Sequence, residues 1–221
     1  MQAIVAAMDA PATPPAVGVG AWSGPWPDDP RLDPDLLRDG DRRNVADRYR
    51  YWSVDAIVAD LDTRRHGFHV AIENFGHDFN IGSVVRTANA FQAAAVHIVG
   101  RKRWNRRGAM VTDRYLHVLH HEDAAALARW CQAEGTDLVG IDNVPGATAL
   151  ETASIPLRCA MLFGQEGEGL SPSAQDHCRE VWSISQFGST RSINAGAAAA
   201  IAMHAWIRRH VFEQVPGGMD R

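Results

Sequence analysis

Residues 69–91 read HVAIENFGHDFNIGSVVRTANAF, and the strand-to-helix junction in this stretch sets the architecture expected of the chain. The run 69–75 is apolar enough for a buried strand, and residues 83–91 have the apolar spacing of a helix. Asn80 ends the polar loop between them, while Arg86 stands among the apolar positions of the helix. In open α/β sheets, ligands bind where strands end and helices begin, so this junction is a candidate site.

The same alternation of strands and helices continues downstream. Further strands are predicted at residues 94–100, 137–142, 159–164 and 180–185, and helices at 122–134, 171–178 and 194–212. Strands that alternate with helices are typical of a parallel sheet covered by helices. The predicted fold class is therefore α/β, with a mostly parallel sheet flanked by helices.

The first 65 residues have a different composition. Residues 1–35 hold seven of the 11 prolines, which break helices and central strands, so they are predicted to form a flexible tail. Residues 36–65 are charged, with apolar side chains at helical spacing, and predict a helical extension of one or two helices. After these two segments we expect a main domain at 66–213 and a C-terminal tail at 214–221.

The helical extension contains a patch of mixed cationic and aromatic side chains. The patch consists of Arg42, Arg43, Arg48, Tyr49, Arg50, Tyr51 and Trp52. Such a mixture can hold RNA through phosphate pairing and base stacking, but it also fits a solvated helix face beside a small core. Both interpretations stay open at the level of sequence.

Composition narrows the class of protein. The formal net charge of −4 argues against a protein that coats nucleic acid through its global charge, while local basic patches stay possible. The three cysteines are widely spaced and the ten histidines show no metal-ligand spacing, so neither disulfides nor a metal site is expected. Neither a signal peptide nor an apolar run of about 18 residues is found, so we expect a cytoplasmic protein away from membranes.

Two further segments are polar loops that follow predicted strands. Residues 162–171, LFGQEGEGLS, place three glycines within six positions, which suits either a plain turn or a backbone that approaches a ligand closely. Residues 184–201, ISQFGSTRSINAGAAAAI, lead from a strand into an Ala-rich helix. Ser192 or Asn194 can serve there as a helix N-cap or as a functional polar group.

Together and in this order, the three segments resemble the three motifs of the SpoU/TrmH family in the SPOUT superfamily. The first resembles its N-x5-R-T-A motif, the second its G-x-E-G-x-G-L-S motif, and the third its G-x3-S-x-N motif. The resemblance covers about residues 66–213 and implies a deep C-terminal trefoil knot, a rare exception to ordinary chain topology. It also implies S-adenosylmethionine as cofactor and a homodimer, with helix 194–212 a candidate for the interface.

The resemblance assigns roles residue by residue. It implies that Arg86 is the principal catalytic residue, assisted by Asn80, Glu166, Ser192 and Asn194. The implied cofactor-binding residues are Gly164, Glu166, Gly167, Gly169, Ile184, Gln186, Phe187, Ser192 and Asn194. The implied activity is methyl transfer to a ribose 2′-hydroxyl of RNA, with transfer RNA the first expectation and ribosomal RNA the second.

Arg86 poses a chemical question, because a free arginine is protonated at physiological pH and is a poor general base. Either an RNA phosphate and a dry interface deprotonate Arg86, or it stays cationic, stabilises the developing alkoxide and leaves the proton to another group. A structural alternative is a surface arginine, or one that pairs with Glu73. The sequence departs from the family pattern at Phe187, usually methionine, and at Ala195–Gly196, usually valine and serine.

A basic run follows the second predicted strand. It contains Arg101, Lys102, Arg103, Trp104, Arg106 and Arg107. This density of cations around an aromatic ring fits a contact with the RNA backbone, although a solvated loop has the same composition.

Two other classes of function compete with the methyltransferase interpretation. A catalytically silent RNA-binding protein of the same fold is the main alternative, and the presence of all five catalytic-motif residues argues against it. A nucleotide-binding oxidoreductase is weaker, because GHDFNIG at residues 76–82 does not supply the G-x-G-x-x-G fingerprint.

Overall fold

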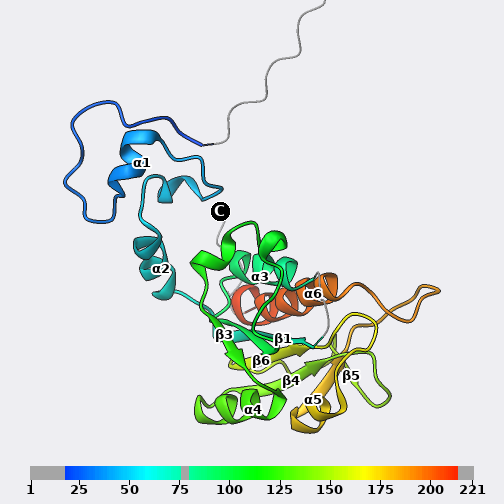
Figure 1. The fold of residues 1–221 in the computed structure, drawn as a ribbon. Helices are drawn as coiled ribbons and strands as arrows, with labels where there is room; N and C mark the ends of the chain where they lie inside the picture. The colour runs from blue at the N-terminus through cyan, green and yellow to red at the C-terminus, as the bar shows by residue number, and fades with distance from the viewer. Residues whose placement is uncertain (1–17, 76–79, 214–221) are drawn as a thin grey trace, which may run out of the picture. The chain divides into compact units, whose positions relative to one another are not determined.

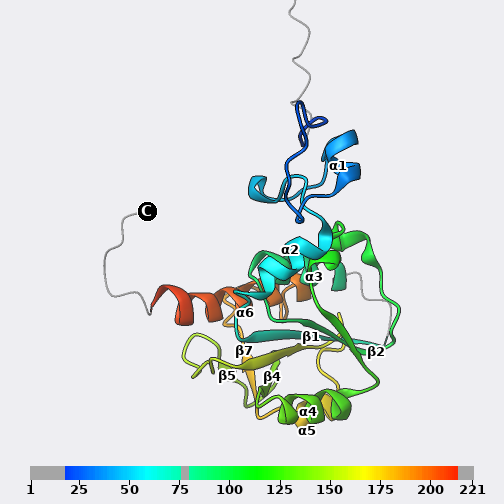
Figure 2. The ribbon, with the colours of Figure 1, turned by 90° about the vertical axis from the view of Figure 1, so that its left-hand side faces the viewer.

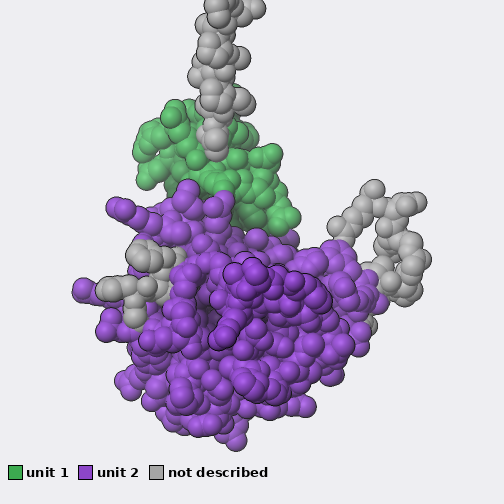
Figure 3. All heavy atoms as spheres, turned by 90° about the vertical axis from the view of Figure 1, so that its right-hand side faces the viewer, with its two compact units in different colours: residues 1–57 green, residues 58–221 purple. Residues whose placement is uncertain are grey.

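The computed structural model describes residues 18–75 and 80–213. The predicted C-terminal tail, the first part of the predicted N-terminal tail and part of the first motif loop lie outside the described residues. The chain divides into two compact units, residues 1–57 and 58–221 (Figure 3). The division falls inside helix α2, Val54–Asp62.

The second unit is built on a seven-stranded sheet with the order β3-β2-β1-β6-β4-β7-β5. Its strands are β1 Phe68–Asn74, β2 Val96–Gly100, β3 Val118–His121, β4 Asp137–Ile141, β5 Thr148–Ala149, β6 Cys159–Phe163 and β7 Glu180–Ser183. Every strand pairing within this sheet is parallel. Strand β6 is a continuous apolar run, and β1 is buried at six of its seven positions although it contains His69, Glu73 and Asn74, as expected for central strands that are covered on both faces. The predicted α/β fold with a mostly parallel sheet is confirmed.

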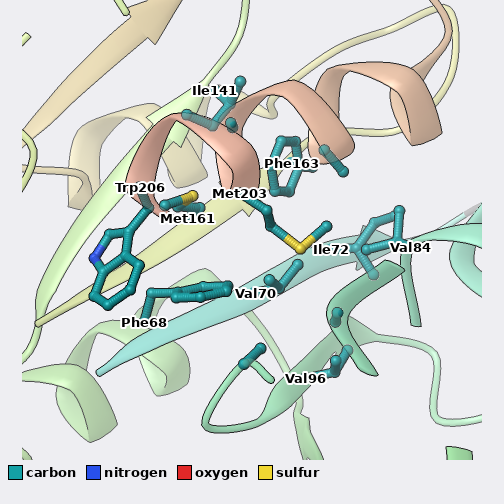
Figure 4. Packing of buried hydrophobic residues seen from close by; sticks show 14 of the residues in the cluster. Phe68, Val70, Ile72, Val84, Val96, Ile141, Met161, Phe163, Met203 and Trp206 are labelled. Atoms are coloured by element: carbon teal, nitrogen blue, oxygen red, sulfur yellow. The ribbon is translucent and has the colours of Figure 1, made fainter. Parts of the chain in front are cut away.

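Helices cover both faces of the sheet (Figures 1 and 2). Helices α3, Ile81–Ala90, and α6, Ala195–Ile207, lie on one face, while α4, Ala124–Ala133, and α5, Pro172–His177, lie on the other. The core under α3 and α6 includes Phe68, Val70, Met161, Phe163, Met203 and Trp206 (Figure 4). The second layer, under α4, is smaller and consists mainly of Ala, Val, Leu and Cys side chains.

Three histidines form a buried chain under α4. His97 contacts His69 Nδ1 through its Nε2 at 3.1 Å and His121 Nε2 through its Nδ1 at 2.8 Å. The ring of Trp130 packs against His97, with 4.4 Å between centroids. Burial and the two neighbouring imidazoles lower the pKa of His97 to about 2, and burial lowers the pKa of His69 to about 4. The three rings are therefore held neutral in the folded protein.

Several short elements were not predicted from the sequence. Apolar periodicity did not predict four of them: strands β3 and β5 and two 3-10 turns, Arg106–Ala109 and Thr112–Tyr115. Strand β3 has four residues at a sheet edge, two of them exposed and one partly buried, and β5 has only two residues, so neither shows a clear apolar pattern. The predicted helix 194–212 ends as an α-helix at Ile207 and continues as a π-helical turn through Phe212.

The last helix is hydrogen-bonded to an earlier segment of the chain. Trp206 Nε1 donates to the Pro156 carbonyl at 3.1 Å, and His210 Nε2 lies 3.0 Å from the Ile155 carbonyl. Met203 and Trp206 both point toward the sheet, where the Trp206 ring packs against Phe68 of β1 with 4.8 Å between centroids (Figure 4). Helix α6 thus contacts both the sheet and the segment that connects β4 to β6, and Ser185, ahead of α6, is bonded to Glu151 of that segment. The chain is threaded through its own loop, the knotted arrangement expected from the sequence.

The first unit is held together largely by polar contacts around Asp41, which is fully buried. Its carboxylate accepts from the Arg43 side chain at 2.9 and 2.7 Å and from the Tyr51 backbone N–H at 3.0 Å. Burial opposes ionisation, but these bonds hold the pKa of Asp41 at about 2. Arg43 also donates to the Trp52 carbonyl, and Arg31 lies over the Trp52 ring. Much of the cationic and aromatic patch at 42–52 is therefore structural, a role that neither sequence interpretation anticipated.

No helix within the described residues is long and apolar enough to cross a membrane. Across residues 18–75 and 80–213, no group of three or more His, Cys, Asp or Glu side chains is arranged to hold a metal ion. All three cysteines are free thiols, and burial raises the pKa of each to about 12.

Candidate active site

A pocket of about 550 Å³ lies at the carboxyl ends of β4, β6 and β7. Its walls come from three loops, at residues 141–144, 163–169 and 184–195, and from the first turn of α6. Its volume falls in the range typical of small-molecule sites, and its position follows the rule that ligands bind beyond the carboxyl ends of parallel strands. The second and third sequence motifs both reach this pocket.

The glycines of the second motif are required by the shape of its loop. Gln165 and Gly169 exchange two backbone hydrogen bonds of 3.1 and 3.0 Å, which close a tight turn. Gly167 and Gly169 have φ angles of 92° and 72°, in the left-handed region that favours glycine. A Cβ on Gly164 would collide with the backbone of Gly169. The segment is thus a tight turn and a pocket wall at once, so the two sequence interpretations are compatible.

A neighbouring dipeptide, Asp142–Asn143, ties the pocket loops together. Asp142 Oδ2 accepts from the Leu170 N–H at 2.7 Å, which anchors the end of the second motif. Asn143 Nδ2 donates to the Arg191 carbonyl at 3.0 Å, which anchors the third-motif loop. The sequence analysis missed both residues. Their signal was their position directly after a buried strand, the same rule that identified the first motif.

The first motif joins the other two through Asn80, which is 8% exposed. Asn80 Nδ2 donates to Glu166 Oε2 at 2.8 Å, and Asn80 Oδ1 accepts from Asn194 Nδ2 at 2.8 Å. Asn194 Oδ1 also accepts from the Ala197 N–H at 3.2 Å and so caps α6. The side-chain amide of Asn194 therefore both caps α6 and contributes to the site. Three of the five catalytic-motif residues, Asn80, Glu166 and Asn194, are joined by these hydrogen bonds.

A second link joins β1 to the second motif. Glu73 is fully buried, and its carboxylate accepts from the Ser171 N–H at 2.8 Å and the Ser171 Oγ at 2.6 Å. No ion pair between Glu73 and Arg86 is found among the described residues, so that structural alternative is not observed. Ser171 in turn caps α5 through Ala174.

Arg86 lies on the exposed side of α3, one turn after Gly82 and Ser83. Within the part of the chain that the structure describes, its guanidinium makes no hydrogen bond or ion pair. A Cβ built on Gly196 would lie 3.4 Å from Ser83 Cβ, so the start of α6 approaches α3 at this turn. Helical side chains lean toward the helix N-terminus, so Arg86 is expected to point toward the Asn80 end of α3.

The pocket includes most of the predicted cofactor-binding residues. Gly164, Glu166, Gly167, Gly169, Ile184, Gln186, Ser192 and Asn194 all line it. Phe187 does not line it and is 97% exposed. Further lining residues that the sequence analysis did not name include Asp142, Asn143, Glu168, Arg191 and Ile193. Three carboxylates and one guanidinium thus face a pocket with apolar sections.

The basic run at 101–107 lies beyond the carboxyl end of β2, beside β1. Asn74 Nδ2, at the end of β1, donates to the carbonyls of Arg101 and Arg103 at 2.6 and 3.0 Å, which fixes the loop backbone. The side chains of all five cations in the run are exposed, and Trp104 is partly buried against the core. Arg106 pairs with Asp113 at 3.4 Å. The basic run and the pocket therefore both lie at the carboxyl ends of the strands.

Comparison with known proteins identifies the relatives of this architecture. A model of the SpoU rRNA Methylase family matches residues 67–204. An uncharacterized tRNA/rRNA methyltransferase of Synechocystis is 29% identical over 178 residues, covering 75% of this chain and 44% of that protein. The chain spans about half the length of the curated relatives it matches.

Two solved structures share the fold. The SpoU methyltransferase AviRb from Streptomyces viridochromogenes, determined in complex with the cofactor AdoMet, superposes with a TM-score of 0.59 at 24% identity and covers 69% of this chain and 61% of that one. The A. aeolicus TrmH/SpoU tRNA modifying enzyme superposes with a TM-score of 0.64 at 16% identity and covers 72% and 83%.

Proposed function

Because the chain belongs to the SpoU rRNA methylase family, we propose that it transfers a methyl group from S-adenosylmethionine to a ribose 2′-hydroxyl of RNA. The observation that carries the proposal is the pair of hydrogen bonds through which Asn80 links Glu166 and Asn194 at the edge of the pocket. They unite the three motifs at the start of α3, the helix that carries Arg86, the family's principal catalytic position. A silent RNA-binding protein would not need this assembly.

The pocket residues fit S-adenosylmethionine. The cofactor carries a sulfonium and an ammonium group, a carboxylate and an adenine, and when bound it supplies an electrophilic methyl group. Asp142, Glu166 and Glu168 can offset its positive charges, and Arg191 can face its carboxylate. The close-packed glycine turn at 164–169 brings backbone groups to the pocket wall without side chains in the way. The AdoMet complex of AviRb supports this choice of cofactor.

The side chains around the pocket have distinct proposed roles. An exposed arginine stays protonated, so Arg86 is assigned to stabilising the alkoxide that develops on the ribose oxygen. The hydroxyl must lose its proton during attack, and Glu166 is the acceptor we propose, with Asn80 fixing one carboxylate oxygen. Ser192 and Asn194 complete the polar rim.

The RNA is proposed to bind along the basic run at 101–107, which shares a sheet edge with the pocket. Transfer RNA is the first candidate and ribosomal RNA the second. The Synechocystis relative is named a tRNA/rRNA methyltransferase, and the A. aeolicus neighbour is named a tRNA modifying enzyme. The three free cysteines agree with a reducing compartment, and we propose the cytoplasm.

A homodimer formed through α6 is the proposed assembly. This helix is apolar around most of its circumference, and a helix of that kind is normally buried on every side. Ile201 nevertheless remains 44% exposed, and Phe212 at the following turn is also exposed. A second copy packed on this side of α6 would cover both.

Methyl transfer to RNA tests the proposal directly. Labelled S-adenosylmethionine is incubated with unmodified tRNA and rRNA and with wild-type protein or the variant Arg86→Ala. Label that disappears in the variant and that makes the modified linkage resist alkaline hydrolysis supports a 2′-O-methyltransferase and identifies the RNA class. Binding of RNA without binding of S-adenosylhomocysteine would instead support the silent RNA-binding protein.

A further inference from the structure

A two-residue turn, Met110–Val111, joins the 3-10 turns at 106–109 and 112–115 and has two unusual properties. Both residues have left-handed backbones, with φ angles of 48° and 68°. Val111 is β-branched, and such residues are rarely found in this region because the branch crowds the backbone. Both side chains are also directed to solvent, since Met110 is 61% exposed and Val111 is 52% exposed. The chain thus holds two apolar side chains outward on a strained backbone.

The surroundings of the turn are firmly packed. Ala109 is fully buried, and Thr112 Oγ1 donates to its carbonyl at 2.6 Å. The preceding Gly108 lies against Gly82 of α3 so closely that a Cβ on Gly82 would be 2.6 Å from the Gly108 Cα. Gly82 is one turn before Arg86 on the same helix. The exposed turn therefore has a fixed position next to the helix that carries the proposed catalytic arginine.

The charge around the turn specifies the partner. Residues 101–114 contain six cations, Arg101, Lys102, Arg103, Arg106, Arg107 and Arg114, and one acid, Asp113, in a chain whose net charge is −4. The Asp113 side chain is only 12% exposed and pairs with Arg106. The cores of protein–protein interfaces are depleted of charge, whereas nucleic-acid sites combine apolar contacts with dense cations. An anionic polymer with accessible apolar faces can pair with the cations and also contact the two exposed apolar side chains.

We propose that Met110 and Val111 form an apolar wedge that contacts the face of an unpaired RNA base next to the methylated ribose, while the flanking arginines bind phosphates. This inference rests on the proposed function and adds the structural class of the substrate. Base faces in an RNA duplex are covered by stacking, but loops and bulges expose them. Apolar side chains that enter a base stack are an established device of nucleic-acid binding. The substrate would then be RNA with an unpaired segment at the target, rather than a continuous duplex.

The test compares binding of two RNA probes to the full-length protein. One probe is a synthetic hairpin with 2-aminopurine in its loop, and the other is a blunt duplex of the same number of nucleotides. The double variant Met110→Gln/Val111→Thr keeps side-chain length and branching while adding polarity. It is expected to weaken hairpin binding about tenfold, to reduce the 2-aminopurine response and to leave duplex binding unchanged.

A matched control comes from the opposite end of the sheet. Leu157 is 60% exposed and precedes the first residue of β6, so Leu157→Gln makes the same apolar-to-polar change far from the strand ends that form the site. It should bind both probes like wild type. A further variant, Val111→Gly, relieves the left-handed strain while removing the side chain. It should melt no lower than wild type yet bind the hairpin more weakly, which separates a binding role from a folding role.

Three results would overturn the wedge. If the double variant bound the hairpin as tightly as wild type, the wedge proposal would be wrong. It would also be wrong if the double variant lost the same affinity for the hairpin and for the duplex. A change from dimer to monomer in light scattering, with RNA affinity intact, would show that the turn contacts protein. Failure of the broader proposal looks different, because wild-type protein would then transfer no methyl group to any RNA, whether or not it binds the hairpin.

Discussion

The side-chain amide of Asn194 donates to the side-chain oxygen of Asn80 at 2.8 Å, across 114 residues of chain. The same Asn80 donates to Glu166, and the same Asn194 caps α6. A single small side chain thus sets the distance between the first helix of the site and the last. Since Asn80 is nearly buried, these bonds exchange little with water and define the geometry beside Arg86.

Replacing Asn80 should therefore affect catalysis more than folding. Asn80→Ala is expected to lower kcat about 10- to 100-fold because the site is no longer held in position, and to reduce stability by about 1–3 kcal/mol, because Asn194 and Glu166 lose a partner. Asn80→Asp keeps the acceptor for Asn194 but places a carboxylate against Glu166. Steady-state kinetics and urea unfolding report the two effects. Wild-type kcat in both variants would show that the link is dispensable.

Arg86→Ala should strongly reduce methyl transfer with little structural cost. The side chain is exposed, so the change in stability is expected to stay within about 0.5 kcal/mol, while activity falls by at least about 100-fold. Affinity for S-adenosylhomocysteine, measured by calorimetry, should not change. Arg129→Ala, on α4 on the other face of the sheet, is the matched control.

The proton acceptor can be identified by the pH dependence of the rate. If Glu166 accepts the proton, the acidic limb of the pH–rate profile should disappear in Glu166→Gln and remain in the residual activity of Arg86→Ala. The reverse pattern would make Arg86 the base and contradict the electrostatic role. Single-turnover rates are the suitable readout, since product release then does not mask the chemical step.

Asn143→Ala should weaken the cofactor site selectively. The change removes the 3.0 Å bond to the Arg191 carbonyl and frees the third-motif loop. We expect S-adenosylhomocysteine to bind about 5- to 10-fold more weakly, which corresponds to roughly 1 kcal/mol for one hydrogen bond. Binding of RNA should be unaffected. Asn44→Ala, in the first unit, controls for the substitution itself.

The basic run should act by neutralising phosphates. Replacing Arg103, Arg106 and Arg107 with alanine should weaken RNA binding and reduce the slope of log K against log salt by about 0.7 for each phosphate of single-stranded RNA that the variant no longer neutralises. Cofactor affinity should stay at the wild-type value. An equal effect of Arg208→Ala/Arg209→Ala, at the end of the last helix, would show that only general charge matters.

The buried histidine chain predicts a loss of stability below neutral pH. The pKa of His97 is about 2 in the folded protein and about 6.5 when unfolded, so only the unfolded state takes up this proton as pH falls below 6.5. Stability should decline through that window, by about 2 kcal/mol between pH 6.5 and 5 from His97 alone. Urea unfolding should show a shallower decline in His97→Gln, while the exposed His177→Gln follows wild type. Parallel curves for all three proteins would exclude this origin.

Much of the fold could be predicted because its strands are short apolar runs that end in glycine or polar residues. This holds for β1, β2, β4 and β6, whose predicted and observed bounds agree within two residues. Strand β3 could not be found, because VLHH at an exposed edge needs a neighbouring strand to define it. The site motifs were found because each carries several constrained residues in a row.

Other residues of the site depend on strand order, which periodicity does not give. Asp142 and Asn143 brace the pocket only because β4 lies between β6 and β7. The charged patch at 42–52 was equally ambiguous, since the pairing of Arg43 with Asp41 depends on how the first unit closes. Local sequence specifies which groups are available, and tertiary structure decides which of them meet.

The threading of α6 through the loop that contains residues 155–156 also sets the order of folding events. During synthesis the loop between β4 and β6 exists before α6 does, so α6 must enter a loop that is already made. The third wall of the pocket comes from the residues that lead into α6, so the pocket cannot exist before this passage is complete. A nascent chain that stops short of α6 can have a nearly complete sheet and still be unable to bind the methyl donor. The cofactor pocket and the knot would then be completed in the same folding step.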